Sequence, residues 1–300
     1  SSLMTGVKQV FPGPRLDGEG LYEMLDSEKV TYSAGVPTVW LGLLQYLEKT
    51  GKELPHLKRG MCGGSALPEA LIRGFEKYGV ELIQGWGMTE MSPVGTVNVL
   101  PPEVKALSLD EQIPYRLKAG RALPFVDMRL VDAEGHILPH DGEADGHLQV
   151  RGPWIIDQYY KTDQPTLTAD GWFDTGDVAI IDEDGFMQIT DRSKDVIKTG
   201  GEWVSSIDIE NAAMLHPGVS QAGVIGVPHP KWQERPLLIV VKKAGQDPTE
   251  EEVKEFLKPK LDKIAWPDAV EFVEHIPLGA TGKVLKTELR KMFKDYKLPG

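Results

Sequence analysis

The sequence predicts an α/β region first, a β-rich unit next and a small α+β domain last. Up to about residue 100, apolar residues at helical spacing alternate with short apolar runs. From Ala122 the apolar period changes to two, and after Ser206 a new set of helices and strands begins. Strands that end in glycines and lead into helices are typical of α/β folds, in which ligands bind beyond the carboxyl ends of the strands.

The composition is that of a globular protein and narrows the classes of function. The chain has 300 residues, 41% hydrophobic and 26% charged, which suggests two domains. A net charge of −12 at pH 7 argues against nucleic-acid binding. The single cysteine, Cys62, excludes an intrachain disulfide and favours a cytoplasmic setting. No apolar run is long enough for a transmembrane helix, so none is expected.

In the first region we expect three helices and three strands. The helices show apolar residues three and four apart, as in Trp40, Leu43, Leu44 and Leu47. Pro68 opens the third helix, at a position where its missing N–H is tolerated. The expected helices cover residues 21–25, 39–47 and 68–78, and the expected strands cover 30–33, 57–61 and 80–84.

The middle of the chain, at about 120–190, predicts a compact, barrel-like β unit. The turns DAEG at 132–135 and DEDG at 182–185 are good hairpin signals. Just before this unit, residues 101–118 carry three prolines and no clear period, so we expect an excursion or a short helix there. The expected strands cover 125–131, 137–138, 146–150, 178–181 and 186–190.

The last hundred residues predict a small α+β domain with its own apolar core. Ser206 is available as an N-cap, and Thr249 with Glu252 forms a capping box. The expected helices cover 207–215, 249–261 and 287–296, and the expected strands cover 219–227, 237–243 and 269–273.

The stretch at 189–206, ITDRSKDVIKTGGEWVSS, has the features of a pivot between two bodies. Its charges alternate in sign, Gly200 and Gly201 allow a sharp bend or close approach of a ligand, and Trp203 adds a large flat side chain. A charged turn followed by a glycine pair suits a hinge. A solvated surface hairpin is the simpler alternative.

Two further features receive a structural interpretation. Cys62 has no base partner in its surroundings in the sequence, so we expect a small buried hydrophobe. The last expected helix has a basic face, for which a solvated surface is favoured and contact with CoA phosphates is the alternative. This face consists of Lys286, Arg290, Lys291 and Lys294.

Six short motifs occur in order along the whole chain. They are GGSA at 63–66, QGWGMTE at 84–90, GHLQVRG at 146–152, GWFDTGD at 171–177, DRSKD at 191–195 followed by two glycines, and PLGATGK at 277–283. Together they resemble the adenylate-forming superfamily, which includes acyl- and aryl-CoA synthetases, luciferase-like enzymes and peptide-synthetase adenylation domains. GEWVSS at 201–206 and HPKWQER at 229–235 further resemble the fatty- or medium-chain acyl-CoA ligase branch.

The resemblance implies a domain organisation. Residues 1–193 would be the carboxyl-terminal part of a large AMP-binding domain, α/β to about 100 and β-rich at about 120–190. Residues 194–300 would be a small mobile lid domain. The family's Ser/Thr/Gly-rich phosphate loop is absent, so we expect the chain to be the carboxyl-terminal portion of a longer synthetase, and the activity of this portion alone is open.

The resemblance also implies a reaction in two steps. A carboxylate attacks the α-phosphate of ATP to give an acyl-adenylate and pyrophosphate, and the thiol of coenzyme A then displaces AMP. Negative charge builds on the α-phosphate in the first step, so fixed cations are needed there. Lys283 matches the family's adenylation lysine, with Gly279 and Gly282 in its loop, while Glu90 matches the Mg²⁺ ligand and Thr89 offers a hydroxyl to the α-phosphate.

Other residues match the family's nucleotide site. Trp86 takes the aromatic position beside the adenine, and Gly64, Gln84 and Gly85 allow a close approach along it. Asp177 matches the carboxylate that accepts hydrogen bonds from the ribose hydroxyls. Without the resemblance, a core tryptophan and a turn-capping aspartate are the alternatives.

The remaining matches lie in the pivot stretch. Arg192 matches an arginine that contacts the ribose, Lys194 falls on the hinge position, and Lys198 reaches toward AMP or phosphate. Gly201 matches the glycine that lines the tunnel for coenzyme A, and Trp203 walls that tunnel or covers the nucleotide.

These matches imply domain alternation. In one arrangement Lys283 lies in the cleft; rotation about Lys194 then removes it and brings Gly201 to the site. The alternatives are transfer to a carrier-protein thiol and a non-catalytic nucleotide-binding module. The expected small-molecule partners are a fatty or other carboxylic acid and coenzyme A, and the family suggests a homodimer.

Overall fold

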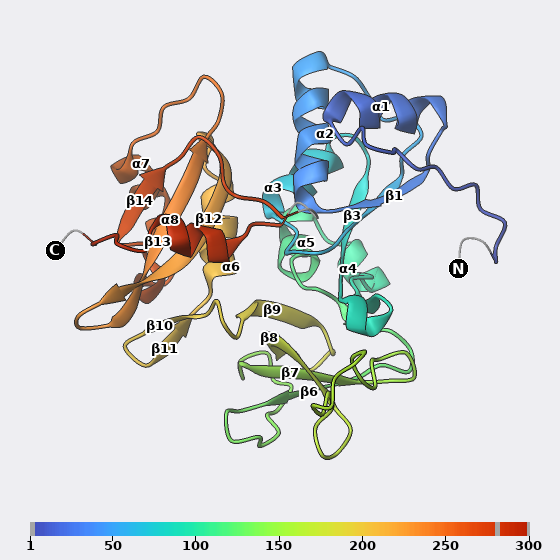
Figure 1. The fold of residues 1–300 in the computed structure, drawn as a ribbon. Coiled ribbons are helices and arrows are strands. Elements are labelled where there is room, and N and C mark those ends of the chain that lie inside the picture. The colour runs from blue at the N-terminus through green and yellow to red at the C-terminus, as the bar shows by residue number, and fades with distance from the viewer. Residues whose placement is uncertain (1–3, 280–282, 299–300) are drawn as a thin grey trace.

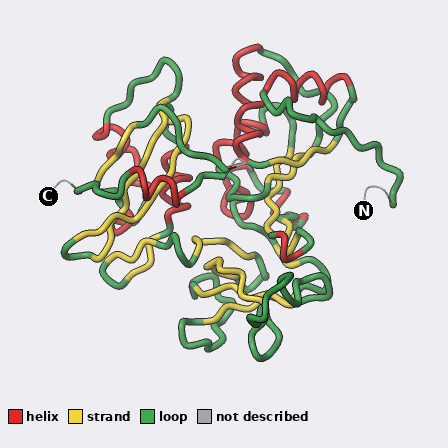
Figure 2. The backbone as a smooth tube through the Cα atoms, viewed as in Figure 1, coloured by secondary structure: helices red, strands yellow, loops and turns green. Residues whose placement is uncertain are grey.

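The computed structural model describes residues 4–279 and 283–298, whose strands form three separate sheets (Figure 1, Figure 2). Figure 1 shows an α/β part in blue and cyan, an antiparallel sheet in green and yellow, and a last part in orange and red. The three parts lie around a common centre in this view. No helix of the described residues is long and apolar enough to cross a membrane.

The first part is an α/β unit whose strands β1, β2 and β3 run parallel, with β4 and β5 added antiparallel. The helices α1 to α3 bury Leu43, Leu47 and Phe75 against β2 and β3, as their helical spacing predicts. The carboxyl ends of the parallel strands therefore meet at one edge. The elements are α1 (Gly18–Ser27), β1 (Tyr32–Gly35), α2 (Pro37–Thr50), β2 (Arg59–Cys62), α3 (Glu69–Glu76), β3 (Glu81–Gly87), η1 (Thr89–Met91), β4 (Val94–Val97), α4 (Pro102–Lys105), α5 (Leu109–Arg116) and β5 (Arg121–Ala122).

The proline-rich segment before the second sheet contains the expected short helix, α5, and a single turn, α4, before it. Ser108 and Glu111 form a capping box at the start of α5, and Pro114 lies inside the helix. The apolar period is too weak to show these bounds, whereas the Ser-x-x-Glu spacing was a signal that could have shown them.

The second part is a four-stranded antiparallel sheet in the order β6-β7-β8-β9. Its core includes Leu130, Leu148 and Met187, which the period of two predicts to lie on one face. The expected strand at 137–138 forms only an isolated bridge, from Ile137 to Val131. Within the described residues β6 and β9 are the two edges, so the sheet is open rather than closed into a barrel. The strands are β6 (Asp127–Val131), β7 (Gly146–Arg151), β8 (Phe173–Ile181) and β9 (Met187–Arg192).

The last part has a sheet in the order β11-β10-β13-β12, with β14 parallel to β13, and a core on each face. Val224 and Leu238 pack under α6 and α7, while Ile225 and Leu237 lie in the core that holds Leu289 of α8. This alternation is the strand period of two. The elements are β10 (Ile197–Thr199), β11 (Glu202–Val204), α6 (Ser206–Met214), β12 (Val219–His229), β13 (Gln233–Lys242), α7 (Glu250–Leu257), η2 (Lys258–Lys260), η3 (Lys263–Ala265), β14 (Ala269–Phe272) and α8 (Lys286–Met292).

Candidate active site

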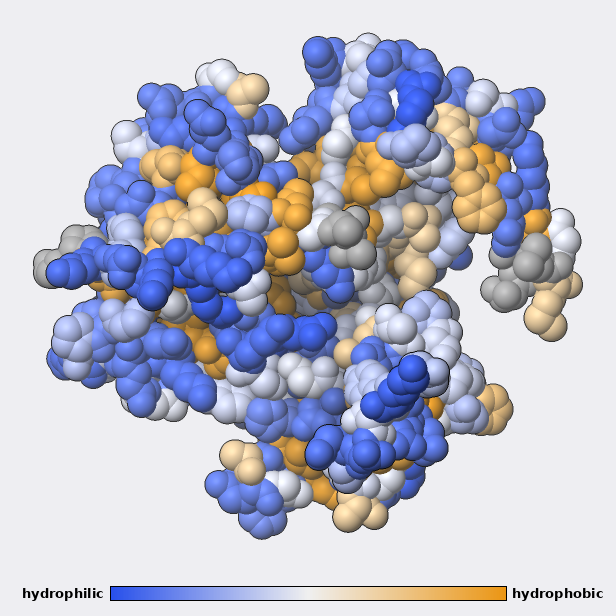
Figure 3. All heavy atoms as spheres, in the orientation of Figure 1, coloured by the Kyte–Doolittle hydropathy of each residue, from blue (hydrophilic) through white to orange (hydrophobic). Residues whose placement is uncertain are grey.

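A cleft of about 510 Å³ lies where the three parts meet. In the view of Figure 3 the surface is hollowed between the last part and the first part, and hydrophobic residues appear in that hollow. The lining combines the turn after β2, the end of β3, strands β8 and β9, and the segment before α8. It includes eight of the residues predicted from the sequence, namely Gly64, Gln84, Gly85, Trp86, Asp177, Arg192, Lys194 and Lys283.

Asp177 is a buried carboxylate of this cleft, with 4% of its side chain exposed. Its Oδ2 accepts a hydrogen bond from the indole N–H of Trp86 at 2.8 Å, and its Oδ1 lies 2.7 Å from Nε of Arg192. The pairing of β8 with β9 places Arg192 opposite Asp177. Burial raises the pKa of Asp177, although Arg192 and the indole N–H oppose this effect. The result is a fixed acceptor beside an aromatic ring, which suits a ligand with vicinal hydroxyls.

The side chain of Lys283 reaches across the cleft to the turn after β2. A Cβ atom built on Gly64 would lie 3.1 Å from Cε and 4.0 Å from Nζ of Lys283. Burial lowers the pKa of Lys283, and the charge of Arg192 lowers it further, while Asp177 opposes both. The loop before it contains Gly282, which lies outside the described residues, and Gly279, whose N–H donates to the Lys283 carbonyl at 2.7 Å.

The turn after β2 is held against β3 by a buried amide. Oε1 of Gln84 accepts from the backbone N–H of Leu67 at 3.1 Å. Gly85 faces Met61 closely, because a Cβ there would lie 2.1 Å from the Met61 Cε. Gly64 has a φ of +89°, which an L side chain rarely adopts. These positions therefore bring bare backbone to the edge of the cleft.

Thr89 and Glu90 follow β3 in the 3₁₀ turn η1 and do not line this cleft. Oε1 of Glu90 accepts from the Tyr159 hydroxyl at 2.8 Å, and the Glu90 carbonyl accepts from the N–H of Ile156 at 2.7 Å. A partly exposed carboxylate beside a cleft fits Mg²⁺, which binds proteins through one or two carboxylates and takes its other ligands from phosphates and water.

Three predicted residues lie on the β10–β11 hairpin, away from the cleft. Lys198 is exposed, and Gly201 sits in the turn, where an added Cβ meets no described atom within 4 Å. Trp203 is 42% exposed, and its ring lies 5.8 Å from that of His147 in an edge-to-face contact. Trp203 thus does not cover this cleft and lines the second cleft described below, and Gly201 faces open space.

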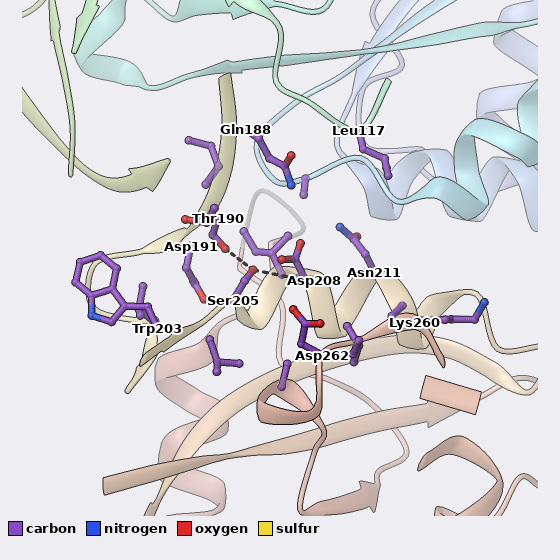
Figure 4. A pocket seen from close by; sticks show the side chains of 18 of the residues that line it. Leu117, Gln188, Thr190, Asp191, Trp203, Ser205, Asp208, Asn211, Lys260 and Asp262 are labelled. Carbon is purple, nitrogen blue, oxygen red and sulfur yellow. Dashed lines mark hydrogen bonds between the residues drawn. The ribbon is translucent and has the colours of Figure 1, made fainter. Parts of the chain in front are cut away.

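A second cleft, of about 770 Å³, lies beside α6 and shares Gln84 and Asp191 with the first (Figure 4). Its lining has five carboxylates against one lysine, whereas the smaller cleft has four carboxylates and four cations. Asp145 and Asp208 are two of the five, and burial raises the pKa of both. Clustered negative charges repel phosphates. The smaller cleft, which has Lys283 and Arg192, is therefore the better nucleotide site.

The expectation of a solvated basic face was wrong for Lys286 and Arg290, whereas Lys291 and Lys294 are exposed as expected. Lys286 is not solvated, since only 12% of its side chain is exposed and its Nζ lies 3.0 Å from Oε1 of Glu210. Arg290 lies 2.7 Å from Oδ1 of Asp195. A helix period shows that a face is polar but not which partner covers it, so no signal within the sequence marks these two residues.

Two family models match the chain. The model described as AMP-binding enzyme matches residues 1–160, and the model described as AMP-binding enzyme C-terminal domain matches residues 208–283. A 3-methylmercaptopropionyl-CoA ligase of Ruegeria lacuscaerulensis is 50% identical over 293 residues, 97% of this chain and 54% of the relative. A long-chain-fatty-acid–CoA ligase of Thermus thermophilus is 50% identical over 300 residues, 99% of this chain and 55% of the relative.

Solved structures agree with these matches. The anthranilate CoA ligase AuaEII, crystallised with anthranoyl-AMP, superimposes with a TM-score of 0.82 at 27% identity, over 94% of this chain and 54% of that one. The chain thus spans about half the length of the curated relatives it matches. The first family model alone covers more than half of the 300 residues. The chain belongs to the AMP-binding enzyme family.

Proposed function

We propose that this chain is part of an ATP-dependent acyl-CoA synthetase, which converts a carboxylic acid, ATP and coenzyme A into acyl-CoA, AMP and pyrophosphate. The observation that carries the proposal is the convergence of Trp86, Asp177, Arg192 and Lys283 on one cleft. These residues come from β3, β8, β9 and the segment before α8. The CoA ligases to which the chain is similar support the reaction class, and the fatty-acid ligases among them favour a fatty acid as substrate.

The geometry suggests a role for each nucleotide-binding residue. Asp177 accepts hydrogen bonds from the ribose hydroxyls, and Arg192 keeps its carboxylate charged against the effect of burial. Trp86 packs beside the adenine, along the bare backbone of Gly64 and Gly85. Gln84 supports this surface by holding the turn after β2.

Lys283 supplies the fixed cation for the first step. Its ammonium group lies in the cleft near Asp177 and Arg192, where it can stabilise the negative charge that develops on the α-phosphate. Thr89 is outside the lining of the cleft in this arrangement, and its predicted contact with the same phosphate rests on the match to the family motif. Glu90 would hold Mg²⁺, and the ion would neutralise phosphate charge when bound.

The two steps require two arrangements of the chain, divided at Lys194 into bodies of residues 1–193 and 194–300. The arrangement described here suits adenylation, because Lys283 lies in the cleft while the hairpin that carries Gly201 lies outside it. Rotation about Lys194 would withdraw Lys283 and bring Gly201 to the path of the coenzyme A thiol. Lys198 and Trp203 on the same hairpin would then approach the site.

The proposal is tested by the release of pyrophosphate from ATP with a panel of fatty and other carboxylic acids, using the full-length gene product. Acid-dependent release is expected, followed by acyl-CoA when coenzyme A is added. If pyrophosphate release depends on the acid but the acyl group is transferred only to a carrier-protein thiol, that thiol would replace coenzyme A in the second step of the proposed reaction. Binding of AMP without any release would contradict an enzymatic function. A cytoplasmic setting and a homodimer stay predictions.

A further inference from the structure

A buried chain of polar groups joins the start of α8 to the end of β9. Lys286, the first residue of α8, donates a hydrogen bond to the hydroxyl of Ser206 and forms the ion pair with Glu210. The hydroxyl and the backbone N–H of Ser206 donate to Oδ2 of Asp191 at 2.6 and 2.8 Å. Ser206 and Asp191 are both buried. One hydroxyl thus accepts from the lysine and donates to the carboxylate, so the three groups satisfy each other away from water.

The charge of Lys286 depends on carboxylates that lie on both sides of the pivot. Burial acts to lower the pKa of Lys286, but Glu210, Asp191 and Asp195 raise it above its ordinary value. Asp191 precedes Lys194 in the chain, whereas Glu210 belongs to α6 beyond it. The direct partners of the ammonium group, Ser206 and Glu210, both follow Lys194, and its link to Asp191 runs through the Ser206 hydroxyl, which bridges the two segments that rotation about Lys194 would move apart.

Three further contacts lie near the same junction. One turn along α8, Nη2 of Arg290 lies 2.7 Å from Oδ1 of Asp195, which is a charge contact rather than an aligned hydrogen bond. The same nitrogen donates to the Lys194 carbonyl at 3.4 Å. On the side of α6 that Figure 4 shows, the Ser205 hydroxyl donates to the carbonyl of Thr190 at 2.5 Å. The Ser205 contact thus joins the start of α6 to β9, whereas the contacts of Arg290 fix residues 194 and 195 at the pivot itself.

The position of α8 in turn sets the position of Lys283. Only two residues separate Lys283 from Lys286. Two backbone hydrogen bonds, from Gly279 N–H to the Lys283 carbonyl and from Leu285 N–H to the Pro277 carbonyl, tie residues 277 and 279 to residues 283 and 285 before α8. A shift of α8 is therefore transmitted to the catalytic ammonium group.

We infer that Lys286 is a positioning residue that, through Ser206, holds Asp191 in place. This inference rests on the proposed function. Because Asp191 precedes the pivot at Lys194 and Ser206 follows it, rotation there breaks the contact between them. A contact made in one of two arrangements shifts the equilibrium toward that arrangement. Lys286 thus favours the arrangement in which Lys283 lies in the cleft, and it acts on adenylation and not on thioester formation.

The test compares two half-reactions in the full-length protein: carboxylate-dependent exchange of pyrophosphate into ATP, and acyl-CoA formation from supplied acyl-AMP. The variants are Lys286→Met and Ser206→Ala. The second keeps both charges and removes one oxygen, so it remains informative where Lys286→Met fails to fold. Lys291→Met is the matched control, because Lys291 lies on the same helix with 72% of its side chain exposed and pairs only with Glu288 among the described residues.

We expect Lys286→Met and Ser206→Ala to lower the exchange rate by about tenfold, which corresponds to the loss of one charge-assisted hydrogen bond. Acyl-CoA formation from supplied acyl-AMP should stay close to the wild-type rate, and Lys291→Met should change neither rate. Equal loss in both half-reactions, or no loss in either, would overturn the inference. A wild-type protein without either half-reaction would instead overturn the proposed function, before any variant is compared.

Discussion

Gly64 offers a test of the adenylation site in which the backbone and the contact with Lys283 can be separated. A Cβ at this position would lie 3.1 Å from Cε of Lys283 and 3.2 Å from Cγ1 of Val36, both closer than the 3.4–4 Å of ordinary contact. The φ of +89° adds a backbone cost of about 1–2 kcal/mol for any L side chain. Gly64→Ala should therefore both destabilise the protein and push the ammonium group of Lys283 out of place.

The two effects have different sizes and different controls. A misplacement of about 1 Å at a catalytic group lowers the reaction rate on the order of 100-fold. A shift of a few tenths of an ångström should therefore lower the adenylation rate by roughly tenfold. Gly135→Ala is the matched control, because Gly135 has the same φ of +89° and an added Cβ there meets no described atom within 4 Å. It should lower the melting temperature by a similar few degrees and leave adenylation unchanged.

The assay is carboxylate-dependent exchange of pyrophosphate into ATP, with the melting temperature of each variant measured alongside. We expect the two variants to lose similar stability, whereas only Gly64→Ala should exchange pyrophosphate more slowly. If Gly64→Ala exchanged pyrophosphate as fast as Gly135→Ala, Lys283 would not act from the position that the structure shows.

Three further predictions concern the cleft and the core. Asp177→Asn should weaken AMP binding by about 2 kcal/mol, roughly 30-fold by calorimetry, because hydrogen bonds to a charged acceptor are lost. The partner Arg192 adds little to this loss, because its side chain is 43% exposed and is not left as a buried unpaired charge. The pKa of Asp177 is raised in the folded state, so its ionisation costs the folded protein stability as the pH rises through that pKa. The Asn variant should therefore gain stability relative to the wild type from about pH 4 to 7. Parallel curves of stability against pH for the two proteins would refute this. Trp86→Phe keeps a ring but removes the N–H donor, so the free energy of AMP binding should weaken by about 1 kcal/mol. An unchanged affinity would show that the indole does not orient Asp177. Burial raises the pKa of Cys62 to about 12, so Ellman's reagent should label the thiol only after denaturant unfolds the protein; rapid labelling of the native protein would contradict its placement in the core.

The sequence predicted elements well where a strong period coincided with clear ends. Helix α2 and helix α7 followed from apolar spacing and, at Thr249, from a capping box that the structure contains. Strands β1 and β2 lie about two residues later than expected, because short apolar runs do not show where pairing begins. The β10–β11 hairpin was recognised only as a turn with charges, since its strands are three residues each.

The candidate site depended on the family resemblance rather than on local pattern. Trp86 and Asp177 are far apart in the sequence, and either one alone suits a core or a turn; only the tertiary fold brings the indole to the carboxylate. Lys286 shows the opposite case, in which an apparently ordinary surface lysine is buried against two partners from α6. The predicted role of Gly201 depends on the proposed rotation about Lys194, because Gly201 lies outside the cleft in this structure.

The central claim is that Lys283 performs adenylation from within the cleft formed with Asp177 and Arg192. The most direct measurement compares Lys283→Ala with the wild type in both half-reactions of the full-length protein. The account predicts that acid-dependent exchange of pyrophosphate falls by roughly 100-fold or more, as for loss of a group that stabilises transition-state charge, while supplied acyl-AMP is still converted to acyl-CoA at close to the wild-type rate. An equal loss in both half-reactions, or exchange that persists without the lysine, would contradict it.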